Sequence, residues 1–232
     1  MKITVVGASG LIGTKVVDAL RRDGHDVVAS SRASGVDVVT GAGLTDALAG
    51  ADALVDVTNS PSFEADAVMN FFTTSASNLV NAARVAGVGN YVALSIVGVD
   101  GLPDSPYFRA KVAQEKIITE SGILYSIVRA TQFAEFADAI TESMTVSSEV
   151  RVPDALIQPI PADEVASAVA RAAVSEPING IVNVGGPQKI TFEQLARDAQ
   201  ARKGDNTKTV VVDSDARYFG AALQTRSLVT PD

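Results

Sequence analysis

Cysteine and tryptophan are absent from this chain of 232 residues, and histidine occurs only once, at position 25. Without cysteine, disulfide bonds, thiolate nucleophiles and cysteine-based metal sites are excluded. The single His25 lies in a turn between a predicted helix and a predicted strand, which argues against a Ser-His-Asp hydrolase and against a histidine-based metal centre. We therefore predict that the protein has no metal site.

Positive charge and long apolar runs are also scarce. Lysine and arginine total 19 against 27 acidic residues, for a net charge of −8, which disfavours binding to nucleic acid. No apolar run reaches the about 18 residues of a transmembrane helix, and the N-terminus lacks a secretory pattern. The sequence predicts a soluble, cytoplasmic protein without membrane partners. Phe71 and Phe72 lie inside a long predicted helix as core or subunit interface, so a homodimer is left open.

Short apolar runs alternate with helical patterns along the first part of the chain. This rhythm is typical of parallel strands connected by helices that cover both faces of a sheet. We predict an α/β fold with a Rossmann-type doubly wound parallel sheet. The predicted strands are Lys2–Val6, Asp26–Ser30, Val36–Val39, Asp52–Val57, Asn90–Ser95 and Ile123–Arg129, and the predicted helices are Leu11–Arg22, Leu44–Ala49, Glu64–Ala86 and Tyr107–Ser121.

The rhythm weakens after Arg129. Residues 131–153 are polar and irregular, which indicates a mobile segment. The later elements are too small to build a second core, so we predict a single domain over residues 1–232, with a small C-terminal substrate lobe built mainly from residues 131–157 and 187–232. The elements expected there are a helix at Ala162–Val174, a strand at Ile181–Val184, a helix at Thr191–Arg202 and an edge strand at Val210–Val212.

A glycine-rich loop follows the first strand, with the pattern G-x-x-G-x-x-G. Gly7 permits a tight turn, Gly10 lets a pyrophosphate approach the backbone, and Gly13 lets the next helix pack closely on the strand. The N-terminus of that helix offers free N–H groups to an anion. The alternative is a purely structural turn. The residues expected to contact a dinucleotide are Gly7, Ser9, Gly10, Leu11, Ile12 and Gly13.

The end of the second strand favours NADP(H) over NAD(H). An NAD site carries an acidic residue about 20 positions after the glycines, where it binds the ribose 2′-hydroxyl. Here Ser31 and Arg32 occupy the corresponding positions, and no carboxylate occurs between Ala29 and Gly35. Arginine pairs with a 2′-phosphate and serine can donate to it. The alternative is an ordinary surface arginine.

Three residues form a candidate catalytic set. Ser95 ends the fifth predicted strand, and Tyr107 and Lys111 follow with Y-x-x-x-K spacing, which places them on one helical face. Tyr107 could exchange a proton with a substrate oxygen that Ser95 holds, provided that Lys111 and the cofactor lower the tyrosine pKa. The alternative is a partly buried tyrosine beside a solvated lysine.

Together these motifs resemble the short-chain dehydrogenase/reductase superfamily, and more closely its atypical, NmrA-like NAD(P)-binding branch. The resemblance also extends to Asp56-Val57-Thr58-Asn59, Leu94 to Gly98, Val128 to Phe133 and Pro159 to Ala166. It implies that Thr58 and Asn59 lie beside the cofactor ribose, that Ala130 to Phe133 line the nicotinamide pocket, and that Lys111 binds the nicotinamide ribose. The usual Asn-Ala-Gly of the superfamily is replaced by Thr58-Asn59-Ser60.

Three functions are consistent with these residues. The first is an NADPH-dependent oxidoreductase that reduces a small carbonyl or related electrophile, with a small-molecule substrate. The second is a redox sensor that binds NADP and regulates a partner without turnover, since the branch contains both kinds of protein. The third, an epimerase or isomerase of a sugar nucleotide, ranks last because such enzymes usually have a larger substrate lobe. Tyr107 and Lys111 favour the first.

Overall fold

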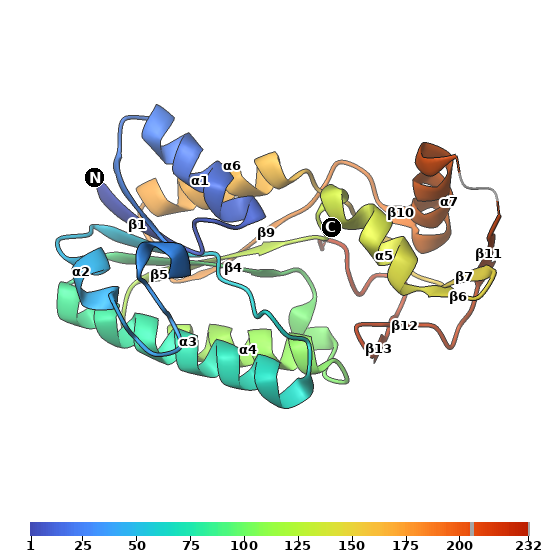
Figure 1. Ribbon diagram of the computed structural model, residues 1–232, viewed down its shortest axis with the longest axis horizontal. Helices are drawn as coiled ribbons and strands as arrows, with labels where there is room; N and C mark the ends of the chain where they lie inside the picture. The colour runs from blue at the N-terminus through green and yellow to red at the C-terminus, as the bar shows by residue number, and fades with distance from the viewer. Residues whose placement is uncertain (205–206, 232) are drawn as a thin grey trace.

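The computed structural model describes residues 1–204 and 207–231. Figure 1 shows two parts along its long axis: a parallel sheet covered by helices on both faces, and a smaller lobe at one end of the sheet. The first part positions the candidate site, and the lobe reaches over its edge. Positions 205, 206 and 232 of the predicted lobe lie outside the described residues.

The central sheet confirms the predicted Rossmann-type fold. Its order is β2-β1-β3-β4-β5-β9, and every neighbouring pair is parallel. The chain passes from β1 to β2 on one side and then to β3 on the other side of β1. Ligands bind at such reversal points, above the carboxyl ends of the strands. The strands are β1 (Lys2–Val6), β2 (Asp26–Ser30), β3 (Ala53–Asp56), β4 (Asn90–Ile96), β5 (Tyr125–Ala130) and β9 (Gly180–Val184).

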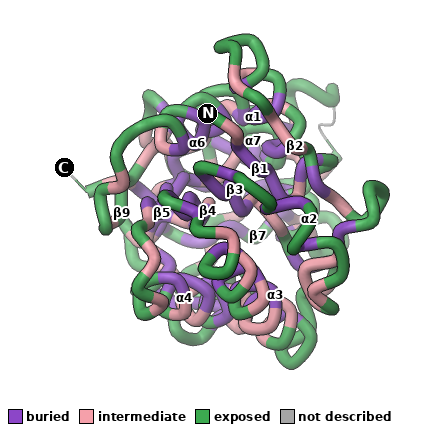
Figure 2. Tube along the Cα trace, turned by 90° about the vertical axis from the view of Figure 1, so that its left-hand side faces the viewer, coloured by how far each residue is buried: buried purple, intermediate pink, exposed green. Residues whose placement is uncertain are grey.

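Two pairs of helices sandwich this sheet, as Figures 1 and 2 show. The helix α1 forms as predicted because Ile12, Val16 and Leu20 recur every four residues and are all buried against the sheet. On the opposite face, Leu79 and Ile118 pack with the strands. One face carries α1 (Leu11–Arg22) and α6 (Ala162–Val174); the other carries α3 (Ala65–Ala86) and α4 (Pro106–Thr119), with the short α2 (Leu44–Leu48) next to α3.

The predicted strand at 36–39 is wrong. Val36 is buried, but the segment turns instead of pairing with the sheet. Asp37 Oδ1 accepts the N–H groups of Val39 and Thr40, at 2.8 and 3.1 Å. The amide of Asn78, on α3, donates to the carbonyls of Val38 and Val39, both at 2.9 Å. Side chains therefore satisfy the backbone groups that a neighbouring strand would have paired.

The expectation of an irregular segment at 131–153 is also wrong, because it holds α5, β6 and β7. In β7, Val150 and Val152 are buried and alternate with the less buried Glu149 and Arg151. They pack with Phe192 and Tyr218 in a buried cluster that also includes Phe108 of α4, so the lobe shares this cluster with the sheet part of the molecule. The pattern is hard to find in the sequence because β7 pairs with β11, a segment far along the chain. The remaining elements are α5 (Ala137–Ser143), β6 (Thr145–Val146), β7 (Glu149–Val152), β8 (Leu156–Ile157), β10 (Ile190–Thr191), α7 (Phe192–Lys203), β11 (Thr209–Val212), β12 (Arg217–Tyr218) and β13 (Ala221–Ala222), with three-residue 3-10 helices η1 (Arg32–Ser34), η2 (Val99–Gly101) and η3 (Ala134–Phe136).

The predicted helices at 162–174 and 191–202 and the strand at 181–184 are confirmed, with shifts of at most one residue at their ends. Val210–Val212 is confirmed as an edge strand, although it belongs to the small lobe sheet β11-β7-β6 and not to the central one.

Candidate functional site

The glycine loop lies between β1 and α1. Its three glycines differ in how much room the surrounding backbone leaves for a side chain. Gly7 has φ +85°, and a Cβ there would lie 2.8 Å from the carbonyl oxygen of Val57. A Cβ on Gly13 would lie 2.1 Å from the oxygen of Gly7. A Cβ on Gly10 would meet only that same oxygen, at 3.3 Å, and Gly10 is exposed. The protein's own backbone requires Gly7 and Gly13, whereas Gly10 leaves one side open.

The N-terminus of α1 can receive an anion. Gly10 is its N-cap, and no side chain caps the helix. Ser9 and Leu11 are exposed beside it, while the side chain of Ile12 is buried in the core. Free first-turn N–H groups and the positive end of the helix dipole favour a phosphate here. The residues present thus fit the pyrophosphate of a dinucleotide.

Ser31 and Arg32 lie at the end of β2, next to this loop. The carbonyl oxygen of Ser30 accepts the N–H groups of both Gly7 and Ala8, each at 3.1 Å, and this joins the two segments. Arg32 is exposed at the start of η1, and Ser31 is partly exposed. The structure therefore places Ser31 and Arg32, which the sequence assigned to the 2′-phosphate, next to the glycine loop, which it assigned to the pyrophosphate.

The end of β3 lies beside the loop and supplies Thr58 and Asn59. The hydroxyl of Thr58 donates to Asp56 Oδ1 at 2.6 Å, so this side chain is already engaged within the protein. Asn59 Oδ1 accepts the hydroxyl of Tyr107 at 2.9 Å and the N–H of Ser60 at 3.0 Å. Asn59 thus links the end of β3 to α4. Its contact with the candidate proton donor was not expected from the sequence.

Ser95 faces α4, the helix that carries Tyr107 and Lys111. Ser95 pairs in register with Arg129, whose side chain reaches Glu115 on α4, and directly paired residues share a face of the sheet. The Ser95 hydroxyl is buried and has no hydrogen-bond partner among the described residues. The same holds for Thr131 Oγ1 and Gln132 Oε1, just beyond β5. Buried polar atoms are normally paired. We call the carboxyl ends of β4 and β5 the crest. Three buried polar atoms without a partner lie near it, and they fit a polar ligand.

Tyr107 lies among aromatic rings at the start of α4. Its ring centroid is 5.9 Å from that of Phe72 and 5.9 Å from that of Phe108. Burial raises the pKa of Tyr107 to about 12, and the hydrogen bond to Asn59 opposes the shift only in part. Lys111 is not among the groups that shift this pKa in the protein without a cofactor, and a lower pKa caused jointly by Lys111 and a bound cofactor stays a prediction. The phenol is therefore held in its protonated form.

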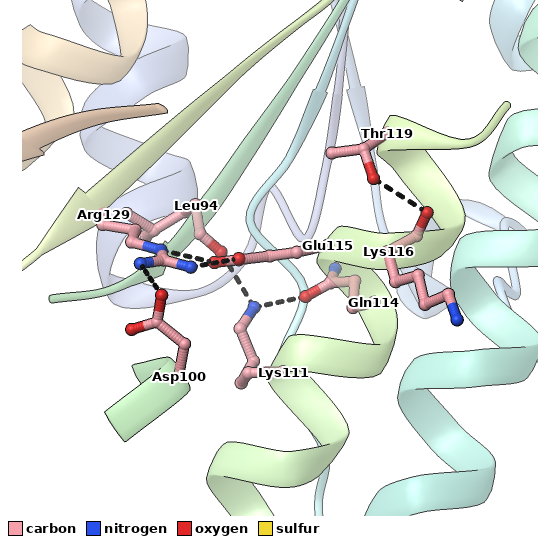
Figure 3. A network of polar contacts seen from close by, with 8 residues as sticks. All are labelled: Leu94, Asp100, Lys111, Gln114, Glu115, Lys116, Thr119 and Arg129. Carbon is pink, nitrogen blue, oxygen red and sulfur yellow. Dashed lines mark hydrogen bonds and ion pairs between the residues drawn. The ribbon is translucent and has the colours of Figure 1, made fainter. Parts of the chain in front are cut away.

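Lys111 points from α4 towards Leu94 and Gln114, as Figure 3 shows. Its ammonium donates to the carbonyl oxygen of Leu94 at 2.8 Å and to Gln114 Oε1, and it lies 4.6 Å from the centroid of the Phe72 ring. Burial lowers the pKa of Lys111 to about 8, while Asp56 opposes the change. The alternative of a solvated lysine is wrong. Lys111 is 3% exposed and fastens α4 to β4.

Sequence reasoning missed the buried polar groups around Lys111. Gln114 Nε2 donates to Asp56 Oδ2 at 2.8 Å, and the hydroxyl of Tyr91 donates to the same oxygen at 3.0 Å. Burial, followed by the charge of Asp56, raises the pKa of Tyr91. The available signal was the spacing of Gln114, three residues after Lys111 on one helical face.

A second buried group, also drawn in Figure 3, lies one turn further along α4. Arg129 on β5 donates from Nε and Nη2 to the two carboxylate oxygens of Glu115, at 2.9 and 2.6 Å, and from Nη1 to Asp100 at 3.1 Å. The hydrogen bond to Glu115 raises the pKa of Arg129. This bidentate pair ties α4 to β5.

Ala130 and Phe133 differ in which of their atoms a ligand could contact. The side chain of Ala130 is buried in the core on the α1 face, so only its backbone can face a ligand. Phe133 is partly exposed, and its ring lies 5.5 Å from that of Phe136.

Among residues 1–204 and 207–231, no cluster of three or more metal-ligating side chains occurs. Nor does any helix in that part of the chain have the length and apolar character needed to cross a membrane.

Comparison with known proteins agrees with this geometry. A sequence profile of the NAD(P)H-binding family matches residues 7–176. The photosystem II assembly factor Ycf39 of Synechocystis sp. is 25% identical over 149 residues, which cover 58% of this chain and 46% of that protein. The Ycf39 of Cyanophora paradoxa is 24% identical over 165 residues, covering 63% and 51%. The chain thus spans about half the length of these curated relatives.

Solved structures share the fold. MoeE5 in complex with UDP-glucose and NAD superposes with a TM-score of 0.72 at 18% identity, covering 92% of this chain and 89% of that one. The dTDP-4-dehydrorhamnose reductase of Bacillus anthracis in complex with NADP gives 0.73 at 15%, covering 94% and 88%. Identities this low show a common fold only. The family match, however, covers most of the chain, and it agrees with the motifs that resemble NAD(P)-binding proteins. The chain therefore belongs to the NAD(P)H-binding family.

Proposed function

We propose that the protein is an NADPH-dependent reductase of a small carbonyl compound or a related electrophile. The observation that supports this most directly is the presence of two hydroxyl groups on facing elements, one on α4 and one on the strand that α4 covers. Tyr107 is a protonated phenol at the start of α4, and Ser95 has a buried, unpartnered hydroxyl on the strand face that α4 covers. A reduction needs both a proton donor and a group that holds the substrate oxygen.

The cofactor would be held along the crest. The open side of Gly10 and the uncapped start of α1 would take the pyrophosphate, and Ser31 and Arg32 the 2′-phosphate. Thr131 and Gln132 offer the unpartnered polar atoms beside the expected nicotinamide position. When bound, NADPH supplies the hydride that the carbonyl carbon receives.

The side chains of the protein supply the proton. With a pKa of about 12, Tyr107 carries its proton at neutral pH and can give it to the carbonyl oxygen as the carbon is reduced. The hydroxyl of Ser95 donates a hydrogen bond to that oxygen and stabilises the growing negative charge. The products are an alcohol and a phenolate, which regains its proton from water. Lys111 holds α4, which carries Tyr107, against β4, which carries Ser95.

The Tyr107→Phe variant tests this mechanism. It removes only the hydroxyl, so turnover should fall by about 10²–10⁴-fold, the usual contribution of general acid catalysis. The affinity for NADPH should stay unchanged. Tyr125→Phe, at the amino end of β5, serves as the matched control and should retain full turnover. Turnover that is unaffected by Tyr107→Phe would refute the assignment of the proton donor.

A second candidate is an NADP-binding regulatory or assembly protein without turnover. Two observations favour it: the curated relatives are named assembly factors, and the ammonium of Lys111 is already engaged within the protein by Leu94 and Gln114. Tight NADPH binding without reduction of any compound in a broad carbonyl panel would support it.

From the sequence, the third function, a sugar-nucleotide epimerase, ranks last because the lobe is small. The size of the lobe is a poor argument for this rank, because this chain covers 85% of the length of a UDP-N-acetylglucosamine 4-epimerase from Bacillus cereus.

A further inference from the structure

Two exposed phenylalanines meet over the ring of Tyr107, although they come from distant parts of the chain. Phe63 lies before α3, and Phe219 lies in the turn between β12 and β13 of the lobe. Their ring centroids are 5.4 and 5.5 Å from that of Tyr107, and 5.5 Å from each other. Phe63 is 56% exposed and Phe219 is 42% exposed. A continuous apolar surface therefore adjoins the candidate proton donor.

The backbone at Phe219 is unusual. Its φ is +48°, in the left-handed region, and the next residue, Gly220, has φ +83°. Hairpin turns of this kind favour Asn-Gly or Gly-Gly, and a bulky aromatic residue at positive φ is an outlier. The ring lies nearly parallel to that of Tyr107, with an interplanar angle of 25°. Residues held in such conformations concentrate at functional sites.

We propose that Phe63 and Phe219 form the binding surface for a flat, apolar ring of the substrate. The substrate class is then aryl or conjugated carbonyl compounds, and not aliphatic or sugar carbonyls. The reason is that an aromatic ring stacks on exposed ring faces, whereas a puckered ring makes poorer contact and sugar hydroxyls lose hydrogen bonds to water there. This inference rests on the proposed reductase function for the position of the reacting oxygen, at Tyr107.

The test compares two aldehydes of nearly equal size, benzaldehyde and cyclohexanecarbaldehyde, with UDP-glucose as a polar third probe. Reduction is followed by loss of NADPH, and binding to the protein with NADP⁺ is followed by saturation-transfer NMR, which needs no turnover. Two added ring contacts correspond to about a tenfold preference for benzaldehyde. Phe219→Leu and Phe63→Leu keep an apolar side chain but remove the ring, so each should lower this preference, taken as the ratio of the two aldehydes within the same variant. Val146→Ala, an exposed apolar residue in another hairpin of the lobe, should leave the preference intact.

The outcomes separate the two proposals. Equal handling of the two aldehydes, tighter binding of UDP-glucose, or a full preference in both phenylalanine variants would overturn the ring surface. Reduction of both aldehydes without preference would overturn this inference alone and leave the reductase proposal standing. Benzaldehyde binding that depends on Phe219, without reduction of benzaldehyde or of any compound in a broad carbonyl panel, would support the surface and refute the reductase. Having two variants from different segments guards against one that fails to fold, which thermal unfolding would reveal.

Discussion

Substitution of Gly10 by valine separates cofactor binding from folding. Gly10 has φ −82° and ψ 173°, an extended conformation that valine adopts readily. The nearest atom to a new Cβ is the oxygen of Gly7, at 3.3 Å, so a small adjustment suffices. Loss of glycine at an N-cap costs about 1 kcal/mol or less. The melting temperature of a domain of this size should therefore fall by only about 2–4 °C.

The valine side chain at position 10 occupies the space through which a pyrophosphate must approach the uncapped start of α1. For the native protein, NADPH at about 100 times its Kd adds about 2.7 kcal/mol of stability, which raises the melting temperature by about 5–10 °C. For Gly10→Val this rise should disappear, and calorimetry should show at least about 100-fold weaker binding, or about 2.7 kcal/mol.

Two further glycines act as controls. Gly89→Val lies before β4, where a Cβ makes an ordinary contact of 3.5 Å with Asp52, so both stability and NADPH binding should persist. Gly13→Ala puts its Cβ 2.1 Å from the oxygen of Gly7 and 2.7 Å from Cα of Ala8, and the fold itself should fail. Native-like NADPH affinity in Gly10→Val would show that the loop is merely a turn, and the assignment of the pyrophosphate site would be wrong.

Three other predictions concern charge. Arg32→Ala should weaken NADPH about tenfold and leave NADH nearly unchanged, because only NADPH carries the 2′-phosphate; an equal loss for both cofactors in calorimetry would remove the basis for NADP preference. Glu115→Gln leaves the buried Arg129 with only the more exposed Asp100, so unfolding in urea should show a loss of about 3 kcal/mol, whereas Glu120→Gln, in an exposed pair with Lys116, should change little. Lys111 has a folded pKa of about 8, below its unfolded value of 10.5, so its burial penalty is complete below pH 8 and is relieved as the pH rises. Wild type should therefore gain stability relative to Lys111→Met between pH 8 and about 9.5, by roughly 2 kcal/mol, and parallel pH profiles would contradict a buried amine.

The chain itself encodes the central sheet and the dinucleotide loop in local patterns. Each parallel strand is a short apolar run, and each helix repeats its apolar residues every three or four positions, so both signals lie within a single segment. Gly7 is needed for its positive φ and Gly13 for its contact with the backbone of Gly7, and both requirements arise within one βα unit, which is why the loop is recognisable from the sequence. The contact of Gly7 with Val57, after β3, appears only in the tertiary structure. The wrong prediction at 36–39 shows the limit of such local patterns. This apolar run has the pattern of a strand, but its carbonyl groups accept hydrogen bonds from the side chain of Asn78, which lies in a later helix.

Only the tertiary structure decided what the candidate catalytic residues face. Spacing placed Tyr107 and Lys111 on one side of a helix, but it could not show that Lys111 turns inward to Leu94 or that Tyr107 donates to Asn59. Nor could it show that Phe219, more than a hundred residues later, stacks on Tyr107. Burial and pKa depend on which side chains surround a group in space, and those neighbours come from separate segments that meet only when the sheet and the lobe are assembled.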